Sequence, residues 1–174
     1  REIKSVERTS TDKTSFLSKL DMKIEIVEFN WENRSRAIQL LSKTNQFNTT
    51  GKRYSEQELT KIQSDNGDVL TVRIKDKFGS DEIIAVVIIK YFSRIAYIDN
   101  DVMSCRVMGR GVETAVLADI CNRAIMKKCK EIRGEIIELE RNTPCQEVYS
   151  ENGFTESEKN IYARSTEDPI KFPK

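Results

Sequence analysis

The stretch MSCRVMGRG, residues 103–111, lies between a strand-like run and a long amphipathic segment, and it decides the fold. Arg106, Gly109 and Gly111 stand in the spacing Arg-x-x-Gly-x-Gly. Glycines let the backbone turn tightly and approach a ligand, and the free N–H groups and positive dipole end of a following helix favour a pyrophosphate. A tight strand-to-helix turn needs glycine with or without a ligand, so the turn alone leaves both interpretations open. The candidate phosphate contacts are Arg106, Val107, Met108, Gly109, Arg110, Gly111 and Val112.

Strand and helix patterns extend outward from this turn in both directions. Three strand-like runs precede it, at residues 69–74, 83–92 and 94 to about 103. After it, residues 111 to about 130 repeat apolar side chains on one helical face, and residues 132–139 return to a strand pattern. A strand–helix–strand unit of this kind is parallel and right-handed, and ligands tend to bind at the carboxyl ends of such strands. The turn is therefore expected at a ligand-binding edge.

The remaining segments complete an alternating order of strands and helices. Ser55 opens a helix with the capping box Ser-Glu-Gln-Glu, and a polar segment, residues 43–54, precedes it. The order predicted from residue 22 onward is strand, two helices, three strands, helix, strand, helix, strand. The other predicted elements are a short helix at 16–20, a strand at 22–29, helices at 37–41 and 143–151, and a strand at 154–163.

Length and charge limit the classes of protein. A chain of 174 residues fits one domain, and 29 Lys and Arg against 28 Asp and Glu give no general surface for nucleic acid. No apolar run approaches the roughly 20 residues that span a bilayer, and the first residues lack the apolar core of a secretory signal. We expect a soluble, cytoplasmic protein without a membrane partner, with a linker or upstream remnant at 1–20, the domain at 21–165 and a tail at 166–174.

Cysteine and histidine usage narrows the chemistry. The chain contains no histidine, which excludes Ser/His and Cys/His catalytic pairs, and its four cysteines form no CxxC pair. We therefore expect no metal. Cys121 and Cys129 lie eight apart in the helical pattern, which indicates buried thiols.

A second motif, RNTPCQEVYSENGF at residues 141–154, follows the last strand of the crossover. An asparagine in the place of Asn142 can hydrogen-bond a pantetheine amide, and Tyr149 can reach a thiol sulfur and donate a proton to a leaving thiolate. Taken singly, Asn142 also suits a helix cap, and Tyr149 and Phe154 suit the core. Their occurrence together after the glycine turn favours a ligand site.

The glycine turn, the spacing from Asn142 to Tyr149 and the pair Gly153-Phe154 resemble the GNAT acyltransferase superfamily. The resemblance covers nearly the whole chain. It implies an α/β (α+β) fold with a central mixed, splayed sheet flanked by helices. It also implies that a pantetheine arm, on coenzyme A or on a carrier protein, enters between the splayed strands.

Two strings, KTNQFNTTGKRYSEQEL and SCRVMGRGVETAVL, resemble more narrowly the FkbH-like proteins, which prepare glyceryl-carrier-protein intermediates for polyketide extender units. This resemblance implies an acyl carrier protein as partner, and a haloacid-dehalogenase-like phosphatase domain that this chain lacks. The sequence departs from that family at residues 138–142, where Glu138-Leu139-Glu140-Arg141 precede the asparagine, and at Gly51 and Lys52. These departures leave open whether this chain uses the same acyl substrate as the FkbH-like proteins.

Three functions remain open at this stage. The first is transfer of a small, glyceryl-like acyl group to or from a phosphopantetheine thiol, and the second is an acetyl-CoA-dependent N-acetyltransferase. The third is a non-catalytic module that binds a carrier protein. Cys105, near a helix start and Arg106, suits either a covalent acyl carrier or a small buried residue. The candidate catalytic residues are Cys105, Asn142 and Tyr149, and the candidate substrate contacts are Asn45, Gln46, Asn48 and Arg53.

Overall fold

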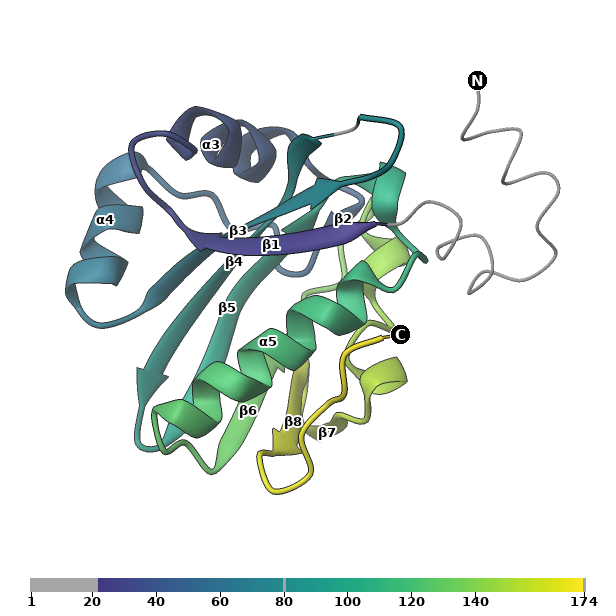
Figure 1. The fold of residues 1–174 in the computed structure, drawn as a ribbon. Helices are drawn as coiled ribbons and strands as arrows, with labels where there is room; N and C mark the ends of the chain where they lie inside the picture. The colour runs from purple at the N-terminus through teal and green to yellow at the C-terminus, as the bar shows by residue number, and fades with distance from the viewer. Residues whose placement is uncertain (1–21, 80, 174) are drawn as a thin grey trace, which may run out of the picture.

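The computed structural model describes residues 22–79 and 81–173, which form a mixed sheet with helices on both faces (Figure 1). The helices are α3 (Arg34–Lys43), α4 (Glu56–Ser64) and α5 (Val112–Met126), and short 3₁₀ turns cover Cys105–Val107, Thr143–Cys145 and Ser150–Asn152. The strands are β1 (Lys23–Glu28), β2 (Phe47–Asn48), β3 (Asp68–Lys75), β4 (Asp81–Phe92), β5 (Ile95–Met103), β6 (Glu131–Glu135), β7 (Thr155–Glu158) and β8 (Ile161–Ser165).

The sheet runs in the order β1-β3-β4-β5-β6-β8-β7, and β2 pairs with β5 beside this path. The β5–β6 pair is parallel and is joined through α5, as the crossover pattern predicted. The other neighbouring strands are antiparallel. The expected α/β architecture with a mixed, helix-flanked sheet is confirmed.

Apolar side chains fill both faces of the sheet. On one face α5 packs against a cluster that includes Leu70, Val87 and Ile98. On the other face α3 and α4 pack against Val69, Val86 and their neighbours. Strand β4 is buried on both faces, so it reads as an almost continuous apolar run. The middle of the sheet is thus tightly packed on both faces, and it supports the ends of the strands, where the glycine turn lies.

Strands β5 and β6 separate after a short shared stretch. Their register runs from Ile95 opposite Glu131 to Ile98 opposite Gly134. Beyond that point β2 lies against β5, with Phe47 opposite Met103 and Asn48 opposite Val102. The edge that β6 leaves is therefore covered by a segment from the connection between α3 and α4.

Most predicted elements are present, and the capping box at Ser55 forms with Glu58. Three predictions need correction. The strand predicted at 132–139 ends at Glu135, and the helix predicted at 143–151 consists of 3₁₀ turns around Pro144. The final strand is a hairpin of β7 and β8, which turns at Asn160 with a left-handed φ of 67°. The helix predicted at 16–20 and the linker at 1–20 lie outside the described residues.

No helix in the described residues is long and apolar enough to cross a membrane. The largest exposed apolar side chain is Trp31, between β1 and α3, with 77% of its surface exposed.

Candidate functional site

The glycine turn forms as predicted at the start of α5. A 3₁₀ turn over Cys105–Val107 follows β5, and the chain then reverses at Gly109 and Gly111, with φ values of 76° and 85°. Residues other than glycine rarely adopt these left-handed backbone conformations, which explains why glycine stands at both positions. Gly111 is the residue before the first turn of α5. The backbone of the turn is thus shaped to present N–H groups at a helix start.

Acidic side chains already contact this turn. The N–H of Gly109 donates to Oε1 of Glu113 at 2.5 Å. Glu113 belongs to the first turn of α5. Arg106, predicted to attract phosphate, instead forms an ion pair with Glu82 at the start of β4. Two of the predicted phosphate contacts, Arg106 and Gly109, therefore have partners within the chain.

A cavity of about 320 Å³ opens beside the turn. One wall comes from the start of α5, and the other from the segment that carries the Asn142-to-Tyr149 motif. Strand β2 contributes Phe47. The lining residues are Phe47, Gly109, Gly111, Glu113, Thr114, Pro144, Glu147, Val148, Glu151 and Asn152. The structure thus brings together the two motifs that the sequence places about 40 residues apart.

Tyr149 is fully buried and does not line this cavity, although its neighbour Val148 does. Its ring covers Gly134 on β6, where an added Cβ would lie 2.3 Å from the Cζ atom of the ring. The hydroxyl of Thr49 is near, but it already donates to Asn100 and accepts the N–H of Asp101. The Tyr149 hydroxyl has no hydrogen-bond partner among the described residues, and burial raises the pKa of Tyr149 well above 10.0.

Two polar side chains of β5 are buried in the same region. Asp101 is fully buried, and neither of its carboxylate oxygens has a hydrogen-bond partner among the described residues. Burial, with a smaller contribution from Glu113, raises the pKa of Asp101 from 3.8 to about 7. Asn100 accepts hydrogen bonds from Thr49 and Thr50, while its amide nitrogen has none in the described part of the chain.

Asn142 acts as a clamp between segments. Its side-chain nitrogen donates to the carbonyl oxygens of Asn48 at 2.9 Å and Ile137 at 2.8 Å, and its oxygen accepts the N–H of Leu139 at 2.8 Å. The residue has no exposed surface. Asn142 therefore fixes β2 to the chain after β6, and a contact from its side chain to a ligand stays a prediction.

A second cavity, of about 230 Å³, contains three of the four predicted substrate contacts: Asn45, Asn48 and Arg53. Its other lining residues are Gly51, Leu139, Glu140 and Arg141. Phe47 lines the first cavity and Asn48 lines the second. Because neighbouring residues of a strand point to opposite faces, the two cavities lie on opposite sides of β2. Arg53 donates to the Leu41 carbonyl at 2.6 Å and to Asn45 at 3.1 Å. Gln46 is exposed and does not line this cavity.

A charged cluster lies at the junction of β5, β6 and the loop after β2. The ammonium of Lys52 lies 3.0 Å from Asp99 and 3.4 Å from Glu135. Tyr54 donates to the other oxygen of Asp99 at 2.6 Å, and Lys90 lies 3.6 Å from this carboxylate. Burial opposes ionisation of Asp99, but the hydrogen bonds from Tyr54 and Lys52 outweigh it and lower its pKa. Asp99 is thus a fully paired carboxylate.

Cys105 is exposed, so the interpretation of Cys105 as a small buried residue is wrong. It does not line the cavity beside the turn, and its catalytic role stays a prediction. Cys121 and Cys129 are buried as predicted. Cys145 is also buried, and burial raises its pKa to about 11. Glu138 is exposed after the end of β6.

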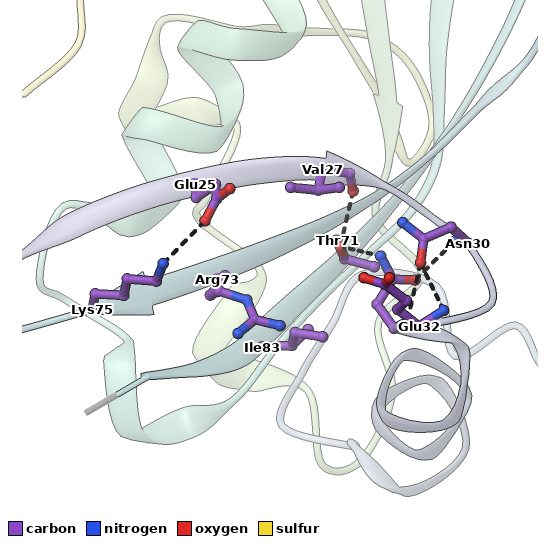
Figure 2. A pocket seen from close by; sticks show the side chains of 9 residues that line it. Glu25, Val27, Asn30, Glu32, Thr71, Arg73, Lys75 and Ile83 are labelled. Carbon is purple, nitrogen blue, oxygen red and sulfur yellow. Dashed lines mark hydrogen bonds and ion pairs between the residues drawn. The ribbon is translucent and has the colours of Figure 1, made fainter. Parts of the chain in front are cut away.

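A third concavity lies over β1 and β3 (Figure 2). Glu25 and Val27 reach it from β1, and Arg73 and Lys75 reach it from β3 (Figure 2). Lys75 pairs with Glu25 at 3.6 Å, and Arg73 pairs with Asp81 at 2.9 Å. Its cations are therefore matched by nearby carboxylates. Over residues 22–79 and 81–173, no group of acidic, cysteine or histidine side chains is placed to hold a metal ion.

Sequence reasoning missed Asp101, Glu113 and the Asp99 cluster. Asp99, Asn100 and Asp101 stand in succession inside an otherwise apolar strand, and that run of polar residues was an available signal. Glu113 carried no such signal, because an acidic residue is ordinary in the first turn of a helix. The Lys52 and Tyr54 contacts depend on how a polar loop folds back across the sheet.

Known proteins resemble this chain in structure. No protein-family model and no curated protein matches the sequence. An acetyltransferase of the GNAT family from Staphylococcus aureus Mu50 matches with a TM-score of 0.63 and 14% identity, over 83% of this chain and 99% of that chain. The spermidine N-acetyltransferase of Vibrio cholerae, solved with CoA and spermine, has a TM-score of 0.64 and 14% identity, over 83% and 96% of the two chains.

The PaiA N-acetyltransferase of Thermoplasma acidophilum, solved with coenzyme A, has a TM-score of 0.60 and 17% identity, over 82% of this chain and 99% of that chain. Each neighbour is matched over almost its whole length, so the likeness extends to the complete arrangement of strands and helices. The chain therefore has the fold of the GNAT acetyltransferases.

Proposed function

We propose that this protein is an acyltransferase that moves a small acyl group to or from the thiol of a phosphopantetheine arm, on a carrier protein or on coenzyme A. The observation that carries the proposal is the cavity between the start of α5 and the 143–152 segment. The same segment carries Tyr149, a buried residue whose hydroxyl has no hydrogen-bond partner among the described residues. The GNAT fold supports the proposal at the level of architecture.

Tyr149 suits the role of proton donor. Thioester exchange forms one carbon–sulfur bond and breaks another, and the departing sulfur is stabilised by a proton. Because burial raises the pKa of Tyr149 well above 10.0, the phenol stays protonated at neutral pH. A buried, otherwise unpartnered O–H group is free to donate to a sulfur that reaches it.

The charged cluster favours a thiol acceptor over an amine, because a thiol loses its proton close to neutral pH without a strong base. An amine must lose a proton before it attacks, and a free carboxylate near the junction of β5 and β6 would help to remove it. Asp99 is not free, because Lys52, Lys90 and Tyr54 surround it. The ammonium of Lys52 also lies where Asp99 and Glu135 would attract an amine.

The second cavity would receive the acyl group. Asn45 and Arg53 supply amide and guanidinium donors there, which suit a hydroxylated, glyceryl-like group. The buried amide of Asn48 bonds Thr44 and Gly51. Arg141, which also lines it, would suit an acyl group that carries a carboxylate. We further propose an acyl carrier protein and a haloacid-dehalogenase-like phosphatase as partners in the cytoplasm, within polyketide-type biosynthesis, on the strength of the TNQFN and SCRVMGRGVE strings.

Replacement of Tyr149 by Phe tests the proposal. The protein is incubated with acyl-CoAs and acylated carrier proteins, each with a thiol acceptor, and the intact masses of all proteins are followed. We expect Tyr149→Phe to lower the transfer rate at least about tenfold. The melting temperature should be unchanged or higher, because the lost hydroxyl has no partner.

Tyr162→Phe is the matched control, since it removes a hydroxyl from a ring that packs 6.1 Å from that of Tyr149 and should keep the wild-type rate. A wild-type rate in Tyr149→Phe would refute the acid role. An increase in the mass of the enzyme by one acyl group would support Cys105 as a covalent acyl carrier. Binding of carrier protein without any transfer would favour the non-catalytic module.

An N-acetyltransferase is the second candidate. The structural neighbours named above that carry a stated activity are N-acetyltransferases, and two were solved with coenzyme A. Acetylation of an amine panel with acetyl-CoA, measured beside the thiol acceptors, separates the two functions. Faster transfer to amines than to thiols would replace the first proposal by the second.

A further inference from the structure

Glu113 places a carboxylate against the part of the chain that would bind phosphate. Its Oε1 accepts the N–H of Gly109, and a hydrogen bond to an ionised carboxylate is stronger than one between neutral groups. The positive end of the α5 dipole stabilises the same carboxylate, because Glu113 lies in the first turn of the helix. The carboxylate of Glu113 therefore already occupies part of the anion-binding turn.

The cavity next to the turn is also acidic. Glu113, Glu147 and Glu151 line it, whereas no lysine or arginine does. Arg106, which could have offset them, pairs with Glu82 instead. A strongly anionic group entering here meets like charges.

The two carriers of pantetheine differ in charge at this point. Coenzyme A carries a diphosphate and a further phosphate on its nucleotide, and the diphosphate would need the N–H groups of the turn. On a carrier protein the arm ends in a single phosphodiester to a serine and bears no nucleotide. The arm itself is neutral in both cases, so the acidic lining does not exclude it.

We infer that Glu113 fills the anion-binding turn and selects a pantetheine arm that lacks a diphosphate, as on a carrier protein, over coenzyme A. The inference deepens the proposed function and rests on it. To bind coenzyme A, the protein must rotate Glu113 away from Gly109 or hold its carboxylate a few ångströms from the diphosphate. A carrier-protein arm brings a single phosphodiester charge to the same place, so it meets less repulsion from Glu113 than the diphosphate does.

Binding of coenzyme A, 4′-phosphopantetheine and pantetheine to the wild type, Glu113→Gln and Glu113→Ala tests the inference. We expect Glu113→Gln and Glu113→Ala to bind coenzyme A at least about tenfold more tightly than the wild type, because one like charge is removed at short range. Affinity for pantetheine should change less than about twofold. Glu151→Gln removes one charge from the same cavity without freeing an N–H group, and its gain for coenzyme A should not exceed about threefold.

Inorganic pyrophosphate gives a test that does not depend on the proposed function. In ¹H–¹⁵N spectra, the Gly109 amide resonance of Glu113→Ala should shift saturably with pyrophosphate, while that of the wild type stays in place. A wild-type protein that binds coenzyme A as tightly as Glu113→Ala would overturn the inference and leave the proposed function intact. If no pantetheine compound binds any variant, the proposed function fails. The pyrophosphate titration then still decides whether Glu113 occupies an anion site, and an unshifted Gly109 amide in Glu113→Ala would refute it.

Discussion

Asp101 couples the stability of this fold to pH. Burial, followed by the charge of Glu113, raises its pKa from 3.8 to about 7, so the folded protein holds this proton more tightly than the unfolded chain does. Between these two values stability falls as the pH rises, and above about 7 the contribution is constant. We expect Asp101→Asn to remove most of that fall. The difference between wild type and variant should grow by roughly 2–4 kcal/mol from about pH 4 to about pH 8.

Urea unfolding followed by circular dichroism at both pH values measures this growth. Asp99 serves as the control because its pKa is lowered rather than raised. Its contribution to stability is present above the unfolded pKa and is lost in more acidic solution, so Asp99→Asn should destabilise the protein at both pH values. A difference between wild type and Asp101→Asn that does not change with pH would mean that Asp101 is ionised when buried.

At the scale of the elements, strand β6 and the 143–152 segment meet at a single close contact. The ring of Tyr149 lies on Gly134, where a Cβ would come within 2.3 Å of ring carbon Cζ and 2.5 Å of Cε2. The ring also packs against Phe154, with centroids 5.1 Å apart. We expect Gly134→Ala to cost about 1–3 kcal/mol of stability, because a close-packed core resists an added methyl group.

A double-mutant cycle with Tyr149→Leu separates this contact from the intrinsic effect of alanine in a strand. The smaller leucine leaves space for the Cβ, so the two substitutions together should cost clearly less than the sum of their separate costs. Additive costs would show that the ring does not set the residue at position 134.

The elements also show where sequence patterns fail. The three strands of residues 68–103 and the helix α5 have clear apolar patterns in the sequence, and the structure has them close to the predicted bounds. Strand β2 has no such signal, since Phe47 is a single apolar residue in a polar loop. It exists because β5 offers an edge and Asn142 offers a clamp, and both are distant in the sequence. The shortened β6 has the same cause, because the chain after Glu135 turns to bond Thr49.

At the scale of the whole molecule, residues 166–170, which the sequence analysis assigns to a tail, contact the rest of the described chain. The backbone N–H of Thr166 donates to the Lys130 carbonyl at 3.0 Å, and its hydroxyl donates to that of Cys129 at 2.8 Å. Ile170 packs against the core beneath α5. A chain shortened to end at Ser165 should therefore lose about 1–3 kcal/mol of stability, through lost hydrogen bonds and exposed apolar surface.

A chain shortened to end at Lys171 keeps these contacts and serves as the control. Both are compared with the full chain by urea unfolding, and equal midpoints for all three would show that residues 166–170 add nothing to the fold. At this scale the sequence predicted the architecture and the pairing of the two motifs around one cavity. It could not predict that the turn would be filled by Glu113, because that depends on one side-chain torsion and not on a pattern.

Trp31 is the single tryptophan of the chain, and 77% of its surface is exposed in the folded protein. Its indole is already surrounded by water, so its fluorescence emission will change little when the protein unfolds. The same property makes Trp31 a local optical probe. It stands between Asn30 and Glu32, both of which line the concavity over β1 and β3. A blue shift of its emission on mixing with another molecule would therefore report contact at that end of the sheet, far in the strand order from the cavity beside α5.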